Sequence, residues 1–163
     1  MKGQHHYALT VQWTGNKGQG TKTYTAYDRS HTIQVPNKVD ILGSSDPAFR
    51  GDPTRHNPEE LLVSSLSTCH MLWFLHLCAQ NGIIVTDYVD QATGTMVETP
   101  DGGGHFSEVT LRPTVTVAEE SMIDRANELH AQANKLCFIA NSCNFPVHHQ
   151  PNCRTEAVEP SIN

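Results

Sequence analysis

Several features that would place this chain in a common class are missing from its sequence. There are 11 lysines and arginines against 17 aspartates and glutamates, and the net charge of −6 leaves no basic footprint for nucleic acid or an anionic membrane. The longest apolar run, residues 71–79, is interrupted by His76 and is too short to span a bilayer. No apolar signal region precedes the first strand-like pattern. We therefore expect a cytoplasmic protein that engages neither nucleic acid nor a membrane.

Short motifs for common chemistries are missing as well. No Cys-x-x-Cys pair, His-x-x-x-His pair or Gly-x-Ser-x-Gly elbow occurs. The histidines and cysteines around positions 69–78 and 148–153 could supply zinc ligands, but a four-ligand site usually contains one such short spacing, so no metal is expected. The glycine-rich segments 15–20 and 102–104 lie between strand-like runs, whereas a phosphate cradle needs a strand followed by a helix.

The five cysteines do not form an obvious disulfide framework. Their number is odd, and nothing in the sequence indicates secretion. Cys69 and Cys78 are nine positions apart on one expected helix, a rise of about 13 Å, so they cannot bridge each other. Long-range pairs, such as Cys69 with Cys137, remain possible. Charged residues make up only 17% of the chain, which favours a surface partly covered by another subunit.

The clearest element is a helix that begins after Asn57. Asparagine is a good N-cap, Pro58 suits the first helical position, and Glu60 can reach back to complete a capping box. The helix is expected to run to about Gln80 and to end at Asn81-Gly82. Its apolar residues surround nearly the whole circumference, which predicts a central helix that is covered on most sides.

The rest of the chain predicts an α+β domain with mainly antiparallel pairing. One domain over 1–163 is expected, with its core at about 7–147 and a polar surface tail at 148–163. Alternation and turn residues predict a first hairpin (7–13 with 21–27), a third short strand (31–35) and a long ordered loop (36–56). They also predict a second hairpin (83–98 with 105–117), a second helix (119–135) and a last edge strand (144–147).

Cys69 is the candidate reactive residue of this helix. A lone helical cysteine is usually an inert core side chain. Here small polar residues precede it, and the distant Cys137 could resolve an oxidised sulfur. Glu59 lies ten residues earlier, about 15 Å along the axis, so it cannot reach Cys69 within one helix. Either a second copy of the helix packs antiparallel across a dimer axis, or the segment is not helical, or Glu59 only complements the helix dipole.

The run Asn57-Pro58-Glu59-Glu60-Leu61-Leu62, followed by Cys69 and then by Cys137 68 residues later, resembles the OsmC/Ohr family of osmotically inducible and organic-hydroperoxide-resistance proteins. The resemblance extends from about Tyr7 to Val147. The segment 137–142 reads Cys-Phe-Ile-Ala-Asn-Ser, whereas better-known members have Cys-Pro-Val-Ser, which indicates a distinct branch.

The resemblance implies an intertwined homodimer in which sheets wrap two central helices and two sites lie at the interface. It also implies a thiol peroxidase for organic hydroperoxides, with Cys69 as the attacking thiolate and Cys137 as the resolving thiol. Glu59 and an arginine would lower the pKa of the attacking thiol and orient the peroxide. No cofactor is implied, but an external dithiol of lipoyl or thioredoxin type must reduce the disulfide.

The arginine and the activity itself have alternatives. Family members place the arginine in an early strand or in the loop before the helix; Phe49-Arg50-Gly51 favours Arg50, Arg29 is second, and Arg55 is taken as a surface charge. Cys143 could compete as the resolving thiol, although packing is its expected role. The protein could instead be a non-enzymatic stress or ligand-binding protein with inert or metal-binding thiols, or a redox sensor that uses the same thiols without turnover.

Overall fold

The computed structural model describes residues 3–156. Within the chain, packing defines two compact units, residues 1–62 and 63–163. The single domain expected over 1–163 stays a prediction.

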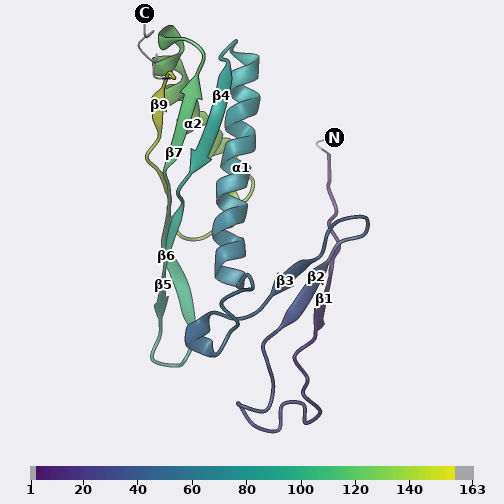
Figure 1. The fold of residues 1–163 in the computed structure, drawn as a ribbon. Helices are drawn as coiled ribbons and strands as arrows, with labels where there is room; N and C mark the ends of the chain where they lie inside the picture. The colour runs from purple at the N-terminus through teal and green to yellow at the C-terminus, as the bar shows by residue number, and fades with distance from the viewer. Residues whose placement is uncertain (1–2, 157–163) are drawn as a thin grey trace, which may run out of the picture. The chain divides into compact units, whose positions relative to one another are not determined.

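The first unit is built on a small antiparallel sheet. Its strands are β1 (Thr10–Trp13), β2 (His31–Gln34) and β3 (Ile41–Gly43), and β2 lies between the other two (Figure 1). A 3₁₀ turn, η1 (Pro47–Phe49), follows β3. The segment 36–56, expected to be a loop, therefore contains both a strand and a helical turn. The first helix, α1 (Pro58–Gln80), begins at the end of this unit.

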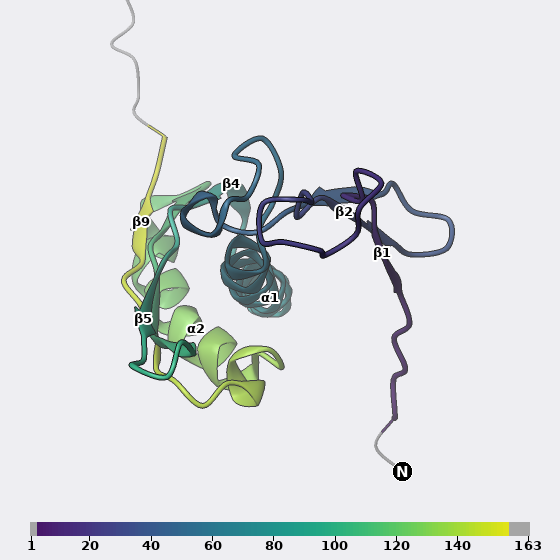
Figure 2. The same ribbon diagram turned by 90° about the horizontal axis from the view of Figure 1, so that it is seen from below.

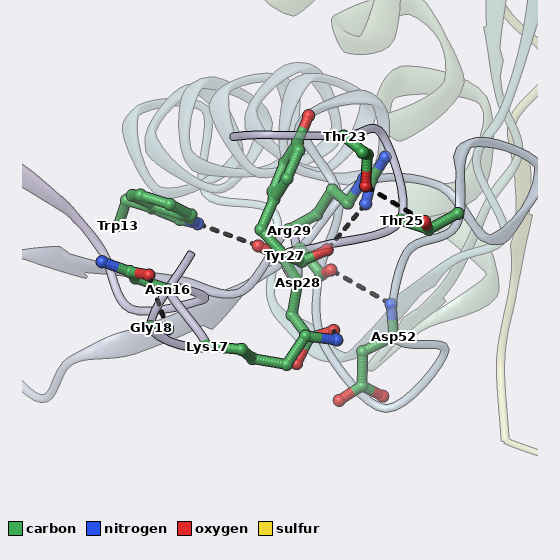
Figure 3. A network of polar contacts seen from close by, with 11 residues as sticks. Trp13, Asn16, Lys17, Gly18, Thr23, Thr25, Tyr27, Asp28, Arg29 and Asp52 are labelled. Atoms are coloured by element: carbon green, nitrogen blue, oxygen red, sulfur yellow. Dashed lines mark hydrogen bonds and ion pairs between the residues drawn. The ribbon is translucent and has the colours of Figure 1, made fainter. Parts of the chain in front are cut away.

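The predicted hairpin between 7–13 and 21–27 is wrong, because β1 pairs with β2 instead. Local side-chain bonds close the intervening segment as a loop (Figure 3). The Asn16 side chain accepts bonds from the amides of Gly18 (2.9 Å) and Gly20 (3.0 Å), and the Trp13 indole N–H donates to the Asp28 carbonyl (2.8 Å). Such bonds compete with strand pairing for the backbone. The segment keeps only an isolated bridge between Asn16 and Tyr27.

Both ends of α1 match the sequence prediction. The Glu60 amide donates to the Asn57 side chain (2.7 Å), and the Glu60 carboxylate accepts from the Asn57 amide (3.2 Å), which is the expected capping box. At the other end Gly82 has a φ of 70°, and the Ile83 amide donates to the Cys78 carbonyl (2.9 Å). Glycine suits this left-handed position because it has no Cβ.

The second unit places α1 and a shorter helix against two mixed sheets. The predicted strands at 83–98 and 105–117 each break in two, giving β4 (Val85–Asp90), β5 (Thr93–Glu98), β6 (Gly104–Leu111) and β7 (Pro113–Val117). β5 pairs with β6 and β4 with β7, both antiparallel. A 3₁₀ turn, η2 (Glu120–Met122), leads into α2 (Ile123–Leu136), and η3 (Ala140–Ser142) follows. Figure 2, viewed along α1, shows α2 and strands of both sheets around the part of α1 that belongs to this unit.

The expectation of a surface tail from residue 148 is wrong as far as residue 154. β8 (Val147–His149) adds parallel to β6, and β9 (Asn152–Arg154) adds parallel to β7. The polar sequence concealed this because only alternate residues of an edge strand face the core; Cys153 is 8% exposed, while its neighbours are exposed. The tail beyond residue 156 lies outside the described residues.

The core of the second unit covers one side of α1 only. Leu66, His70, Phe74, Leu77 and Cys78 are buried on that side. Leu66 packs with β6, and the others pack with residues of α2, β7 and β9. Other apolar side chains of the helix are open to solvent, such as Leu72 at 62% exposure. The second unit therefore does not by itself supply the covering on most sides that the sequence predicted.

By length and composition alone, α1 could cross a membrane. Its mean hydropathy over an 18-residue window is 1.5, and 28% of that window is buried. Core helices of soluble proteins pass the same test, so this is weak support for a membrane span. The cytoplasmic location expected from the sequence stays a prediction.

Candidate active site

The two thiols singled out by sequence meet in the second unit. Cys69 lies in the middle of α1, and Cys137 lies just after α2, where the backbone leaves the helical conformation with φ −64° and ψ 112°. The two side chains are close enough for Cys69 to raise the pKa of Cys137. No disulfide joins them, since both cysteines are free. The attacking and resolving residues expected from the sequence are therefore near each other.

The two thiols differ in access. Cys69 is partly exposed, whereas Cys137 is 1% exposed. Burial raises the pKa of Cys137 to about 11, and the hydrogen bond with Cys69 acts in the same direction. The backbone amides of Ala140 and Ile139 oppose this rise. Cys137 is thus a protonated, sheltered thiol behind a more accessible one.

Cys69 opens into a cavity of about 560 Å³. The floor is largely apolar because Leu72 and Trp73 of α1 meet Phe138 and Ile139, which follow Cys137. Trp73 and Phe138 pack edge to face, with ring centroids 5.6 Å apart. Three polar residues complete the lining: Ser65, Thr68 and His76. No lysine or arginine is among the described residues that line the cavity.

A buried histidine pair, which the sequence analysis missed, joins α1 to α2 beside the thiols. His70 Nε2 and His130 Nδ1 are 2.9 Å apart, and both side chains are 0% exposed. The ring of His130 stacks on Phe74 with centroids 3.8 Å apart, and its Nε2 lies 3.8 Å from the sulfur of Cys153. Since α1 carries Cys69 and α2 leads into Cys137, this pair fixes the two elements that hold the thiols.

Burial keeps these imidazoles neutral. It lowers the pKa of His70 to about 4, with a further contribution from His149, and that of His130 to about 3, with contributions from His70 and His149. His70 Nδ1 has no hydrogen-bond partner among the described residues. The spacing of His70 on the buried stripe of α1, at i−4 from Phe74, was the one sequence signal for this contact.

The candidate arginines occupy different settings in the first unit. Arg29 lies in a pocket of about 370 Å³ whose lining includes Trp13, His31 and Pro58. Its guanidinium stacks on the rings of Tyr24 (4.2 Å to the centroid) and Tyr27 (4.3 Å), and its Nη1 donates to the Tyr27 carbonyl (2.8 Å; Figure 3). Nη2 is buried without a hydrogen-bond partner among the described residues. These contacts hold the Arg29 guanidinium in place, and its Nη2 group is not used as a hydrogen-bond donor.

Arg50, the arginine preferred from the sequence, is exposed and does not line that pocket. It ends η1 with a φ of 65°, and its backbone amide donates to the Pro47 carbonyl (3.0 Å). Arg55 lies 3.6 Å from the Asp52 carboxylate and donates weakly to the His31 carbonyl (3.4 Å). Glu59 is partly buried in the first turn of α1, and its carboxylate forms no ion pair within residues 3–156.

Across residues 3–156, no group of three or more histidine, cysteine, aspartate or glutamate side chains is placed to hold a metal ion. The helical geometry does settle one alternative left open above: the segment between Glu59 and Cys69 is helical throughout. The separation of about 15 Å along the axis therefore applies.

Comparison with known proteins identifies the family. The family model described as "OsmC-like protein" matches residues 51–151. A solved OsmC-like protein of unknown function from Vibrio cholerae O1 biovar eltor strain N16961 is 30% identical, with a TM-score of 0.80 over 91% of this chain and 99% of that one. The uncharacterized protein YmaD of Bacillus subtilis strain 168 is 24% identical over 85% of this chain and 81% of its own length.

An organic hydroperoxide resistance protein from Elizabethkingia anophelis has the same fold, with a TM-score of 0.68 and 16% identity over 96% of this chain and 100% of that one. The chain belongs to the OsmC-like family. Both the resemblance stated from the sequence and the α+β fold class are confirmed.

Proposed function

We propose that this protein is a thiol-dependent peroxidase that reduces organic hydroperoxides to alcohols. The observation that carries the proposal is that an accessible thiol, Cys69, lies near a buried one, Cys137, and raises its pKa. The apolar cavity around Cys69 favours an organic hydroperoxide over hydrogen peroxide, because its floor can bury the organic group. The name of the Elizabethkingia relative, an organic hydroperoxide resistance protein, agrees with this chemistry.

In the first step the Cys69 thiolate attacks the outer peroxide oxygen and the O–O bond breaks. The sulfur is oxidised to a sulfenic acid, and the alkoxide leaves as the alcohol after taking a proton. Cys137 then attacks the sulfur of Cys69, a disulfide forms, and the sulfenic oxygen leaves as water with the Cys137 proton. An external dithiol of lipoyl or thioredoxin type reduces the disulfide by exchange, so no bound cofactor is needed.

The cation for this reaction comes from the first unit of a second copy of the chain. The described residues that line the thiol cavity include no arginine or lysine, and Glu59 cannot reach Cys69 along its own helix. We assign Arg29 the role of stabilising the thiolate and orienting the peroxide, since its Nη2 is buried and unused whereas Arg50 is exposed. Glu59 of the same copy orients the guanidinium.

A homodimer also accounts for the open side of α1. Large apolar side chains exposed there, such as Leu72, favour a surface that another subunit covers. In this arrangement the two central helices of the dimer cover each other, and each thiol cavity is completed by its partner. The oligomeric state in solution, measured by sedimentation, is expected to be a dimer.

The test is turnover of cumene hydroperoxide by the reduced full-length protein with dihydrolipoamide. We expect steady consumption that Cys69→Ser lowers at least about 1,000-fold. Cys143→Ser is the matched control, because Cys143 is partly buried, does not line the cavity, and donates a hydrogen bond to the Ile139 carbonyl (3.3 Å). Turnover by Cys69→Ser would show that Cys69 is not the nucleophile.

Mass spectrometry separates the enzyme from the alternatives. For the wild type we expect a Cys69–Cys137 disulfide after one equivalent of peroxide, and for Cys137→Ser a sulfenic acid that a trapping reagent captures. Disulfide formation without turnover by any dithiol would make the protein a redox sensor. Thiols that do not react, with bound metal in the isolated protein, would make it a non-enzymatic member of the family.

A further inference from the structure

His70 is the neighbour of Cys69 on α1, and it contacts residues that lie on both sides of Cys137 in the sequence. Before Cys137, His130 of α2 faces it, with 2.9 Å between His70 Nε2 and His130 Nδ1. After Cys137, the partly buried His149 of β8 packs against it, with ring centroids 5.8 Å apart. The segment that carries Cys137 is therefore held against α1 at two points, and both contacts are made by one side chain.

The contact between His70 and His130 is directional, which apolar packing is not. A neutral imidazole has one donor and one acceptor nitrogen, so the two rings form one defined hydrogen bond. The ring of His130 is also fixed on its other sides, since it stacks on Phe74 and its Nε2 lies 3.8 Å from the sulfur of Cys153. Apolar side chains can slide past one another, whereas this bond holds α1 and α2 in one register.

The stability of the core does not explain why two imidazoles lie at this position. Both rings are 0% exposed, and His70 Nδ1 has no hydrogen-bond partner among the described residues. A buried unpaired nitrogen costs free energy, and two apolar side chains of similar volume would fill the space without that cost. The benefit of the pair is then expected in what it positions.

We infer that His70 is a positioning residue for the resolving step, in which Cys137 attacks the oxidised sulfur of Cys69. The inference rests on the proposed peroxidase function and specifies which of its steps the imidazoles serve. Through His130 and His149, His70 keeps the buried Cys137 thiol close to Cys69. A thiol held in this way acts at a high effective concentration, so the disulfide forms quickly.

The resolving step competes with a second oxidation of Cys69. In that reaction the O–O bond of another hydroperoxide breaks, one oxygen is transferred to the sulfenic sulfur to give a sulfinic acid, and the alcohol leaves. The sulfinic acid is not reduced by a dithiol, so each such event ends turnover. Fast disulfide formation protects Cys69 from this loss.

The test follows both steps in a single turnover of the reduced full-length protein with cumene hydroperoxide, by rapid quench and mass spectrometry of Cys69. In His70→Leu we expect sulfenic acid formation within about twofold of the wild type and disulfide formation about 10- to 100-fold slower, because only the second step depends on positioning. Sulfinic acid then accumulates as the peroxide concentration rises. His70→Gln, whose amide can replace the Nε2 group, restores most of the rate of disulfide formation.

Leu77→Ala is the control for a general loosening of the core. Leu77 is buried in the same helix and the same core cluster but takes no part in the imidazole contacts. Its truncation destabilises the fold and should leave the rate of disulfide formation unchanged. The double variant with His70→Leu and His130→Leu replaces both polar partners by apolar groups, so it folds without an unpaired nitrogen. It should slow disulfide formation as much as the single change does.

Disulfide formation at the wild-type rate in the double variant overturns the inference, and so does an equal slowing in Leu77→Ala. An equilibrium measurement without peroxide separates this failure from failure of the proposed function. In glutathione buffers, His70→Leu should lower the equilibrium constant for the Cys69–Cys137 disulfide about tenfold, which corresponds to about 30 mV. This loss in a protein that does not turn over peroxide keeps the positioning role without the peroxidase. Turnover with an unchanged equilibrium and an unchanged rate of disulfide formation does the reverse.

Discussion

The cavity at Cys69 and the pocket at Arg29 are complementary in what they contain. The first is lined by Cys69, which lies near the buried Cys137, and has no lysine or arginine among its described lining residues. The second has a fixed guanidinium with an unused, buried donor and no cysteine in its lining. A thiolate needs a nearby cation, and a buried cation needs an acceptor. Each region lacks the group that the other presents, which is why we propose that they serve each other across two copies of the chain.

The most direct test of this complementarity is to remove the guanidinium of Arg29. Arg29→Ala is expected to lower kcat/KM for cumene hydroperoxide about 100-fold, because the donor that stabilises the thiolate is lost. Arg29→Lys recovers only part of the activity, since an ammonium cannot reproduce the planar fork. Stopped-flow measurement of peroxide loss gives the rates.

Arg50→Ala is the matched comparison, and we expect its rate within twofold of the wild type, since Arg50 is exposed. A loss of kcat/KM in Arg50→Ala as large as that in Arg29→Ala would indicate that Arg50, the arginine favoured by the sequence, stabilises the thiolate.

The two units are also expected to respond differently to acid. The second unit buries His70 and His130, whose pKa values of about 4 and about 3 lie below the ordinary value of 6.5. The unfolded chain therefore binds more protons than the folded chain between these values, so stability falls as the pH drops below about 6.5. From pH 7 to pH 5 we expect the free energy of unfolding to fall by up to about 4 kcal/mol.

Urea unfolding at each pH measures this loss, and hydrogen exchange shows where it occurs. Amides of the second unit are expected to lose protection before those of the first. His130→Gln should flatten the pH dependence, whereas His105→Gln, at an exposed site, should leave it unchanged. A pH-independent free energy of unfolding over this range would argue against buried neutral imidazoles in the folded protein.

The smallest expected effect concerns the apolar floor of the thiol cavity. Phe138 is 67% exposed and contributes one edge-to-face contact with Trp73. An aromatic contact between Phe138 and the substrate ring is worth about 0.5–1.5 kcal/mol, so Phe138→Ala should raise KM for cumene hydroperoxide about twofold to tenfold. The effect on tert-butyl hydroperoxide should be weaker, since it has no ring.

Leu136→Ala is the control for Phe138→Ala, because Leu136 is also an exposed apolar residue of the same segment but does not line the cavity. Equal effects of the two changes on both substrates would show that Phe138 only supports the fold.

Local chemistry explains what could be predicted from the sequence. Asn57, Glu60 and Gly82 set the ends of α1 through contacts within a few residues, so both ends were correct. The predicted hairpin is wrong because alternation identifies a strand but not the strand with which it pairs. The hydrogen bonds that the Asn16 side chain accepts hold the following residues in a loop. The strand β9 was missed because its one buried side chain, Cys153, is set between polar neighbours.

For the candidate site, the sequence by itself determined the residue types and one geometric condition. It supplied Cys69 and Cys137 and showed that Glu59 cannot reach Cys69 if both lie on one helix, which the structure then confirmed. Only the tertiary structure decided which groups are buried and which donate no hydrogen bond. The proximity of the two thiols, the burial of Cys137 and the unused Nη2 of Arg29 depend on elements far apart in the chain, and no pattern along the sequence encodes those distances.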